Sequence, residues 1–115
     1  MSVTETFFSV EVADMQRATA FYVDVLGATV LFASPRWSSL GICGVRLGLA
    51  LSSEPPAGPI GLHFRVTDLA EAMAMVERAG GSVASSPVEV APGVVAVRVT
   101  DTEGNTFTLT GGTPT

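Results

Sequence analysis

VADMQRATAFYVDVLG, residues 12–27, joins the end of a strand to a complete amphipathic helix. Just before and at its start, Val10 and Val12 alternate with polar residues, which is typical of a half-buried strand. Asp14 stands where a helix N-cap is expected, because its carboxylate can accept the free amide hydrogens of the first turn. Apolar residues then recur at helical spacing up to Gly27, a residue suited to a left-handed C-cap. The stretch therefore predicts a strand followed by a helix between Asp14 and Gly27.

The same pattern returns 54 residues further along the chain, in FRVTDLAEA, residues 64–72. Asp68 repeats Asp14 as the expected N-cap, and Glu71 three residues later is typical of a capping box. Gly80 and Gly81 follow the second apolar stripe, where a C-cap is again expected. Two copies of one strand-to-helix junction predict two similar half-domains.

Each helix is followed by three runs that read as strands, over residues 29–33, 37–42, 45–51, 82–90, 94–100 and 106–110. Cys43-Gly44 is the expected turn between the second and third of these runs. We therefore predict an α+β fold of two βαβββ modules. We expect one domain over 1–115, with module 1 over about 1–52, a proline-rich linker over about 53–59 and module 2 over about 60–110.

Composition narrows the class of protein. The 115 residues are 47% hydrophobic and only 15% charged, which excludes intrinsic disorder and predicts apolar surface beyond one core. The formal net charge of −5 disfavours nucleic acid and anionic membranes as partners. The single cysteine cannot form an internal disulfide, and neither a signal peptide nor a membrane span is expected, so a cytoplasmic location is the default.

The run over 12–27, the second run over 64–69 and the turn DTEGN, residues 101–105, resemble the vicinal oxygen chelate superfamily. That superfamily includes glyoxalase I, extradiol dioxygenases, fosfomycin resistance proteins and bleomycin resistance proteins. The resemblance implies a cup-shaped mixed sheet with helices on its convex face, and a homodimer. Because one such scaffold carries unrelated chemistries, the resemblance alone does not assign an activity.

The resemblance also implies where a divalent metal would be held, on the first and last strands of each module, usually by His or Gln and by Glu. In this chain those positions fall on Phe7, Gly48, Gly61 and Thr108. Phenylalanine and glycine offer no donor side chain, and one threonine hydroxyl is a weak anchor for a divalent metal. We therefore expect no metal site and no cofactor.

Other side chains on the expected concave face could bind a ligand. His63, the only histidine, has a side chain suited to acid–base chemistry, and the arginines suit carboxylate, phosphate or phenolate groups. Absent side chains at the two glycines would widen the cup, although glycines can also mark strand bulges. The facing of Trp37 and Arg98 stays open. The candidate ligand-binding residues are Phe7, Ser9, Glu11, Trp37, Arg46, Gly48, Gly61, His63, Arg65 and Thr108.

These residues favour a metal-free protein that binds a small molecule, such as an antibiotic or an aromatic metabolite, in the cup or in a dimer groove. The alternative is a metal-independent isomerase, lyase or hydrolase in which His63 and Glu11 form the catalytic acid–base pair. A metal-dependent lyase or dioxygenase is the third reading and fits the donor residues least well. Structural roles for His63, Glu11 and the arginines also stay open at this point.

Overall fold

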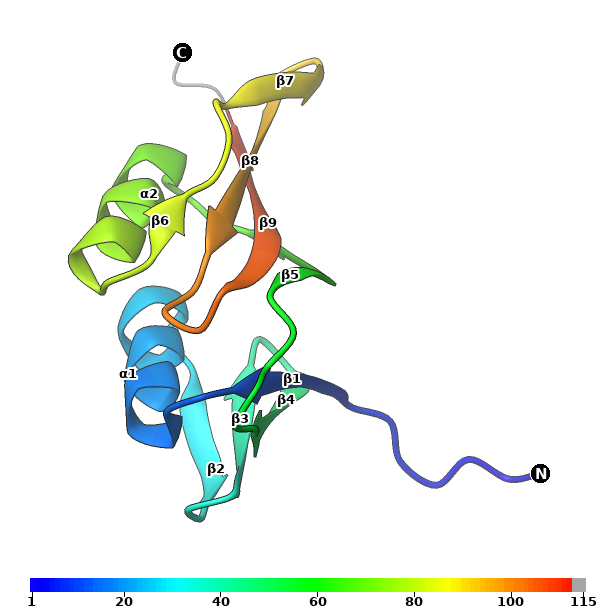
Figure 1. Ribbon diagram of the computed structural model, residues 1–115. Coiled ribbons are helices and arrows are strands. Elements are labelled where there is room, and N and C mark those ends of the chain that lie inside the picture. Colours follow the sequence, from blue (N-terminus) through cyan, green and yellow to red (C-terminus); the bar gives the residue numbers. More distant parts are fainter. Residues whose placement is uncertain (113–115) are drawn as a thin grey trace. The chain divides into compact units, whose positions relative to one another are not determined.

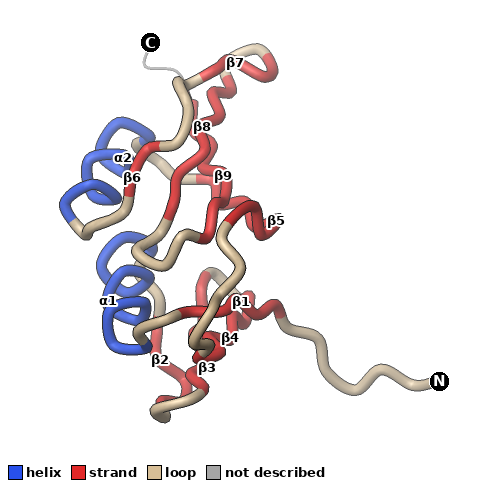
Figure 2. The backbone as a smooth tube through the Cα atoms, viewed as in Figure 1, coloured by secondary structure: helices blue, strands red, loops and turns tan. Residues whose placement is uncertain are grey.

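A computed structural model describes residues 1–112 of the chain, in which the strand–helix–strands order occurs twice, as the repeat predicts, with nine strands in place of the expected eight (Figures 1 and 2). The chain divides into two compact units, Met1–Pro55 and Pro56–Thr115. Each unit holds one helix and one sheet, so the α+β class and the internal repeat are confirmed. The expected cup concerns the placement of the two units and stays a prediction.

The first unit contains β1 (Phe8–Val12), α1 (Met15–Leu26), β2 (Thr29–Ala33), β3 (Trp37–Ile42) and β4 (Val45–Leu51). Its sheet has the order β1-β4-β3-β2, with β1 and β4 parallel and the other pairs antiparallel. Strands β2, β3 and β4 have their predicted bounds. Cys43 and Gly44 both have positive φ, of 48° and 80°, which is the geometry of a tight turn between β3 and β4.

The second unit repeats this topology with β5 (Gly58–Arg65), α2 (Leu69–Arg78), β6 (Ser82–Val83), β7 (Val88–Ala91), β8 (Val94–Thr100) and β9 (Asn105–Gly112). The order is β5-β9-β8-β6, with β7 also paired to β8, and β5 and β9 are parallel. Ser9 lies opposite Gly48 in the first unit, and His63 lies opposite Thr108 in the second. The two parallel ladders therefore share one register.

The predicted strand over 82–90 is wrong in one respect, because it is split into β6 and β7. Between them the Ser85 side chain accepts a hydrogen bond from the Arg98 backbone N–H at 3.0 Å, in place of a strand partner. Pro87 has no N–H to donate to a ladder. Strand β5, the first strand of the second unit, also starts earlier than expected, at Gly58 inside the predicted linker.

Three of the four helix ends follow the predicted caps, whereas α2 has its C-cap at Ala79, one residue before the expected Gly80. The Asp14 carboxylate accepts from the Arg17 N–H and the Asp68 carboxylate from the Glu71 N–H, each at 3.0 Å. Gly27 closes α1 with φ +66° and donates to the carbonyls of the last turn. The Glu71 carboxylate accepts from the Arg78 guanidinium at 2.9 Å, so these contacts form only the Asp68 half of the capping box.

One face of each sheet packs against the helix of its own unit, and that face forms the core. In the first unit the buried side chains of α1, Phe21 and Tyr22 among them, belong to the same core as Val10, Val12 and Leu49 of the sheet. Strand alternation then directs every second residue to the opposite side, which we call the open face of each sheet. Figure 1 shows each helix lying on one side of the sheet in its own unit.

Candidate functional site

The open face of the first unit carries an aromatic pocket of about 260 Å³, lined by Glu5, Phe7, Trp37, Ser39 and Arg46. The Phe7 and Trp37 rings meet edge to face, with centroids 5.8 Å apart and an interplanar angle of 77°. The Trp37 indole N–H donates to Ser39 Oγ at 3.2 Å, which fixes the ring on this face. Trp37 therefore faces the open side of the sheet. Its ring and the Phe7 ring together form an aromatic wall, which is suited to a planar ligand.

Gly48 has a different role from the one expected. A Cβ built at this position would lie only 2.2 Å from Trp37 Cη2 and 2.4 Å from Cζ2. The space that the missing side chain leaves is therefore filled by the indole, and Gly48 itself is buried. The expectation that Gly48 widens a ligand cavity is wrong, because the glycine instead admits the ring that builds the aromatic wall.

Arg46 lies on the open face, as its alternation with Gly48 predicts, and its guanidinium forms an ion pair with the Glu5 carboxylate. Its positive charge is therefore already matched within the pocket.

Ser9 and Glu11 are exposed on β1 and do not line this pocket. Sequence reasoning missed Glu5 and Ser39, although Ser39 has the same strand parity as Trp37 and could have been found by it.

The open face of the second unit carries two adjoining pockets, of about 260 and 210 Å³. Arg98 and Thr108 line both, so they form the wall between them, and the facing of Arg98 is now known. Gly61 and His63 line the smaller pocket, where His63 Nε2 and Thr110 Oγ1 are 2.8 Å apart and share a hydrogen bond. The smaller pocket therefore brings together three of the predicted site residues.

Gly61 marks an irregularity in its strand. It has φ +73°, and the pairing of β5 with β9 shifts register between Pro59 and His63. Nothing lies within 4 Å of a Cβ built at Gly61, so the glycine is required by the backbone conformation and not by a neighbouring group. Unlike the space at Gly48, the space at Gly61 is open toward the pocket.

Arg65 is exposed at the end of β5 and lies opposite Thr110. It shares the open face with His63 but does not line the pocket. The acid–base pair of His63 and Glu11 would join side chains from different units and stays a prediction.

The chemistry of the four positions that the resemblance gives to metal ligands does not fit a divalent metal. Phe7 contributes a ring, Gly48 lies beneath an indole, Gly61 has no side chain, and Thr108 contributes one hydroxyl. Within residues 1–112, no three His, Cys, Asp or Glu side chains gather as a metal would require. We therefore derive no metal-dependent step for this chain.

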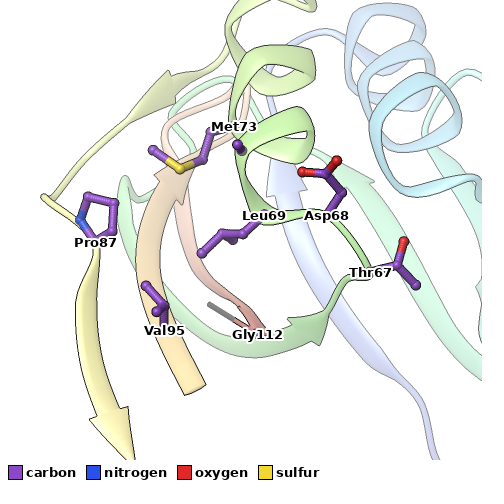
Figure 3. Close-up of a pocket in the computed structure, with 8 residues that line it drawn as sticks. Thr67, Asp68, Leu69, Met73, Pro87, Val95 and Gly112 are labelled. Atoms are coloured by element: carbon purple, nitrogen blue, oxygen red, sulfur yellow. The ribbon is translucent and has the colours of Figure 1, made fainter. Parts of the chain in front are cut away.

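A larger pocket than these three lies elsewhere, at the start of α2, and has about 470 Å³ (Figure 3). Leu69, Met73, Pro87 and Val95 give it a mostly apolar wall from α2, the β6–β7 loop and β8. Its one carboxylate, Asp68, already caps the helix. Sequence reasoning gave this region no function, since the apolar positions of α2 read as core residues.

Comparison with known proteins identifies the family. Residues 6–109 match the model of the glyoxalase/bleomycin resistance protein/dioxygenase superfamily, and the chain belongs to that superfamily. The α+β fold with two sheets is also that of its solved relatives. No curated protein matches the chain.

Three solved structures illustrate the likeness. A glyoxalase/bleomycin resistance protein/dioxygenase family enzyme from Burkholderia phytofirmans PsJN superposes with a TM-score of 0.79 at 18% identity, covering 93% of this chain and 97% of that one. The fosfomycin resistance protein FosX from Listeria monocytogenes, complexed with Mn(II) and sulfate, gives 0.78 at 17%, covering 98% and 93%. An integron cassette protein from V. cholerae gives 0.68 at 23%, covering 96% and 97%. Identities this low support the fold and no particular activity.

Neither α1 nor α2, the helices found in residues 1–112, has the length and apolar character to cross a membrane.

Proposed function

We propose that this chain binds a small molecule on the open faces of its sheets and does so without a divalent metal. The observation that carries the proposal is the chemistry of Phe7, Gly61 and Thr108. These residues occupy positions that the resemblance gives to metal ligands, and all three line pockets. Phe7 contributes an aromatic ring, Gly61 only its backbone, and Thr108 a hydroxyl. The pockets are thus retained at these positions, with side chains that contact organic ligands in place of metal donors.

The aromatic pocket of the first unit supports a planar or apolar group as part of the ligand. Phe7 and Trp37 offer ring surface, and Ser39 and the Arg46–Glu5 pair provide polar groups at its border. Aromatic walls with a few polar groups are typical of small-molecule sites. An antibiotic or aromatic metabolite, the ligand class that we propose, has this character.

A homodimer and a cytoplasmic location belong to the same proposal. The dimer is supported by large apolar side chains that are exposed to solvent in a single chain. They include Phe7, Phe8, Val30, Leu31, Phe32, Val88 and Val90. Val30, Leu31 and Phe32 are consecutive on β2, and exposed apolar surface of this kind is typical of interfaces. Light scattering at micromolar concentration should give about twice the chain mass of 11.8 kDa, and a mass of one chain would contradict the dimer.

A thermal-shift screen tests the binding proposal. The purified chain is screened against aromatic metabolites and antibiotics, each with and without a chelator such as EDTA. A ligand at 100 times its dissociation constant should stabilise the folded state by about 2.7 kcal/mol. We expect hits whose shifts survive chelation. A screen in which every shift depends on added Mn²⁺, Zn²⁺ or another divalent ion would contradict the proposal.

A further inference from the structure

The open face of the second unit has an unusual charge balance for this chain. Strands β5, β8 and β9 contain no Asp or Glu, although the whole protein has a net charge of −5. The same three strands contain His63, Arg65 and Arg98. A face that gathers basic groups in an acidic protein attracts anions at short range, whatever the net charge.

Two of these side chains form a lateral row across the sheet together with Thr108. His63 on β5 lies opposite Thr108 on β9, and Thr108 lies opposite Arg98 on β8. Neighbouring strands are about 4.8 Å apart, so His63 and Arg98 flank Thr108 across roughly 10 Å. We call His63, Thr108 and Arg98 the basic row.

The charged end of the basic row is free to bind a ligand. The backbone N–H of Arg98 donates to Ser85, but no carboxylate of residues 56–112 pairs with its guanidinium. By contrast, the Arg46 and Arg78 guanidinium groups are paired with Glu5 and Glu71. Arg98 therefore differs from these two arginines in keeping its charge unmatched within its own unit.

The surroundings of Arg98 supply further donors. The two pockets that meet at Arg98 and Thr108 are also lined by Ser85 and Ser86 on one side and by Thr106 on the other. A guanidinium presents planar paired N–H donors that match a carboxylate or phosphate, and hydroxyls donate to the remaining oxygens. Volumes of about 260 and 210 Å³ admit such a group but not a large drug.

The corresponding row of the first unit lacks this chemistry. Ser9, Gly48 and Ser39 occupy it, as the shared register requires, and the Trp37 indole covers its centre. The same topology thus carries an uncharged row in one unit and a basic row in the other. This contrast assigns the anionic group of a ligand to the second unit.

We propose that the basic row binds the oxyanion, a carboxylate or a phosphate, of the small molecule that this protein recognises. This inference rests on the proposed function, since it names the class of ligand that the open faces take. Arg98 is the main anchor and Thr108 donates a second hydrogen bond. His63, oriented by Thr110, borders the same pocket.

The test is an NMR titration of the full ¹⁵N-labelled chain with four matched probes: benzoate, phenyl phosphate, benzyl alcohol and benzylamine. We expect the two anions to bind most tightly, with amide shifts centred on residues 61–63, 98 and 106–108. Arg98→Gln should weaken both anions at least about tenfold, the range for a lost charge-assisted hydrogen bond. Arg98→Lys should weaken them less, because the charge is kept and the planar pair of donors is lost.

Arg36→Gln is the matched control, because it removes the same charge from an exposed loop position of the first unit and should change anion affinity less than about twofold. Thr108→Val, which keeps the shape of the side chain, should weaken the two anions more than it weakens benzyl alcohol.

Equal affinities for benzoate and benzyl alcohol, or equal effects of Arg98→Gln and Arg36→Gln, would overturn the inference while leaving small-molecule binding in place. Anion shifts centred on residues 67–73 would also overturn it, because they would locate the site at the start of α2. Failure of the proposed function itself would be seen separately, as the absence of chelator-resistant hits in the thermal-shift screen.

Discussion

Gly48→Ala is the sharpest test of how the aromatic wall is built. The new Cβ would lie 2.2 Å from Trp37 Cη2, whereas carbon atoms in contact prefer about 3.5 Å, so the ring has to move by roughly 1.3 Å. The ring is held by the Ser39 hydrogen bond and by its edge-to-face contact with Phe7. It cannot move without disturbing the pocket that it lines.

The magnitude follows from three effects. Overpacking costs about 1–3 kcal/mol, and loss of the Trp37–Ser39 hydrogen bond adds about 0.5–1.5 kcal/mol if the ring leaves its site. Alanine restricts the unfolded chain and returns about 0.4–1 kcal/mol, because φ at Gly48 is not positive. Together these effects span a loss of about 0.5–4 kcal/mol, so we expect Gly48→Ala to lower the free energy of unfolding by about 2 kcal/mol.

Urea denaturation followed by circular dichroism measures this change, and a double-variant cycle isolates its cause. In a Trp37→Ala background the clash is gone, so Gly48→Ala should be neutral or should stabilise by up to about 1 kcal/mol. Gly41→Ala on β3 is the control, since its Cβ would meet only the tip of Leu31 at 3.4 Å. An equal cost of Gly48→Ala in both backgrounds would refute the packing argument.

Three further predictions concern the caps and turns, each read from urea midpoints. Gly27→Ala should lower the free energy of unfolding by about 1–2 kcal/mol, because φ at Gly27 is +66° and no neighbour lies within 4 Å of the new Cβ. Gly27→Asn should lower it less, and equal losses for the two variants would argue against a conformational origin. Asp101→Ala should destabilise by about 2–4 kcal/mol, because its buried carboxylate accepts from the Glu103 and Asn105 N–H groups at 2.7 and 3.0 Å; a change under about 1 kcal/mol would contradict that role. Asp68→Ala should cost about 1 kcal/mol through loss of the α2 cap, and Asp68→Asn should recover most of it; a variant as stable as the parent chain would contradict the capping role.

Most of the fold could be predicted from the sequence, because local signals agreed with one another. Asp14, Asp68 and Gly27 mark helix ends by chemistry that depends on few neighbours, and alternation gave the strand facing in β1 and β4. The break between β6 and β7 could not be predicted, because it involves a hydrogen bond from the Arg98 backbone N–H to the Ser85 side chain, 13 residues away in the sequence. Apolar and β-branched residues on both sides of that break give the whole segment the pattern of one continuous strand.

The candidate site was predicted less completely. Gly48 and Gly61 look alike in the sequence, but one lies beneath an indole and the other holds a left-handed bulge. Telling them apart requires knowing which ring crosses which strand. The pairing of Arg46 with Glu5 was equally hidden, since the two residues are 41 positions apart and Glu5 precedes the first strand. Because of that pairing, Arg98 and not Arg46 is the pocket-lining arginine without an ion pair in the described part of its own unit.

The proposal of binding without a metal is tested most directly by elemental analysis of the purified chain combined with a ligand titration before and after chelation. We predict divalent metal far below about one equivalent per chain, and a ligand affinity that EDTA leaves unchanged. About one equivalent of zinc, nickel, manganese or iron per chain, together with binding that is lost on chelation and restored by the ion, would contradict it.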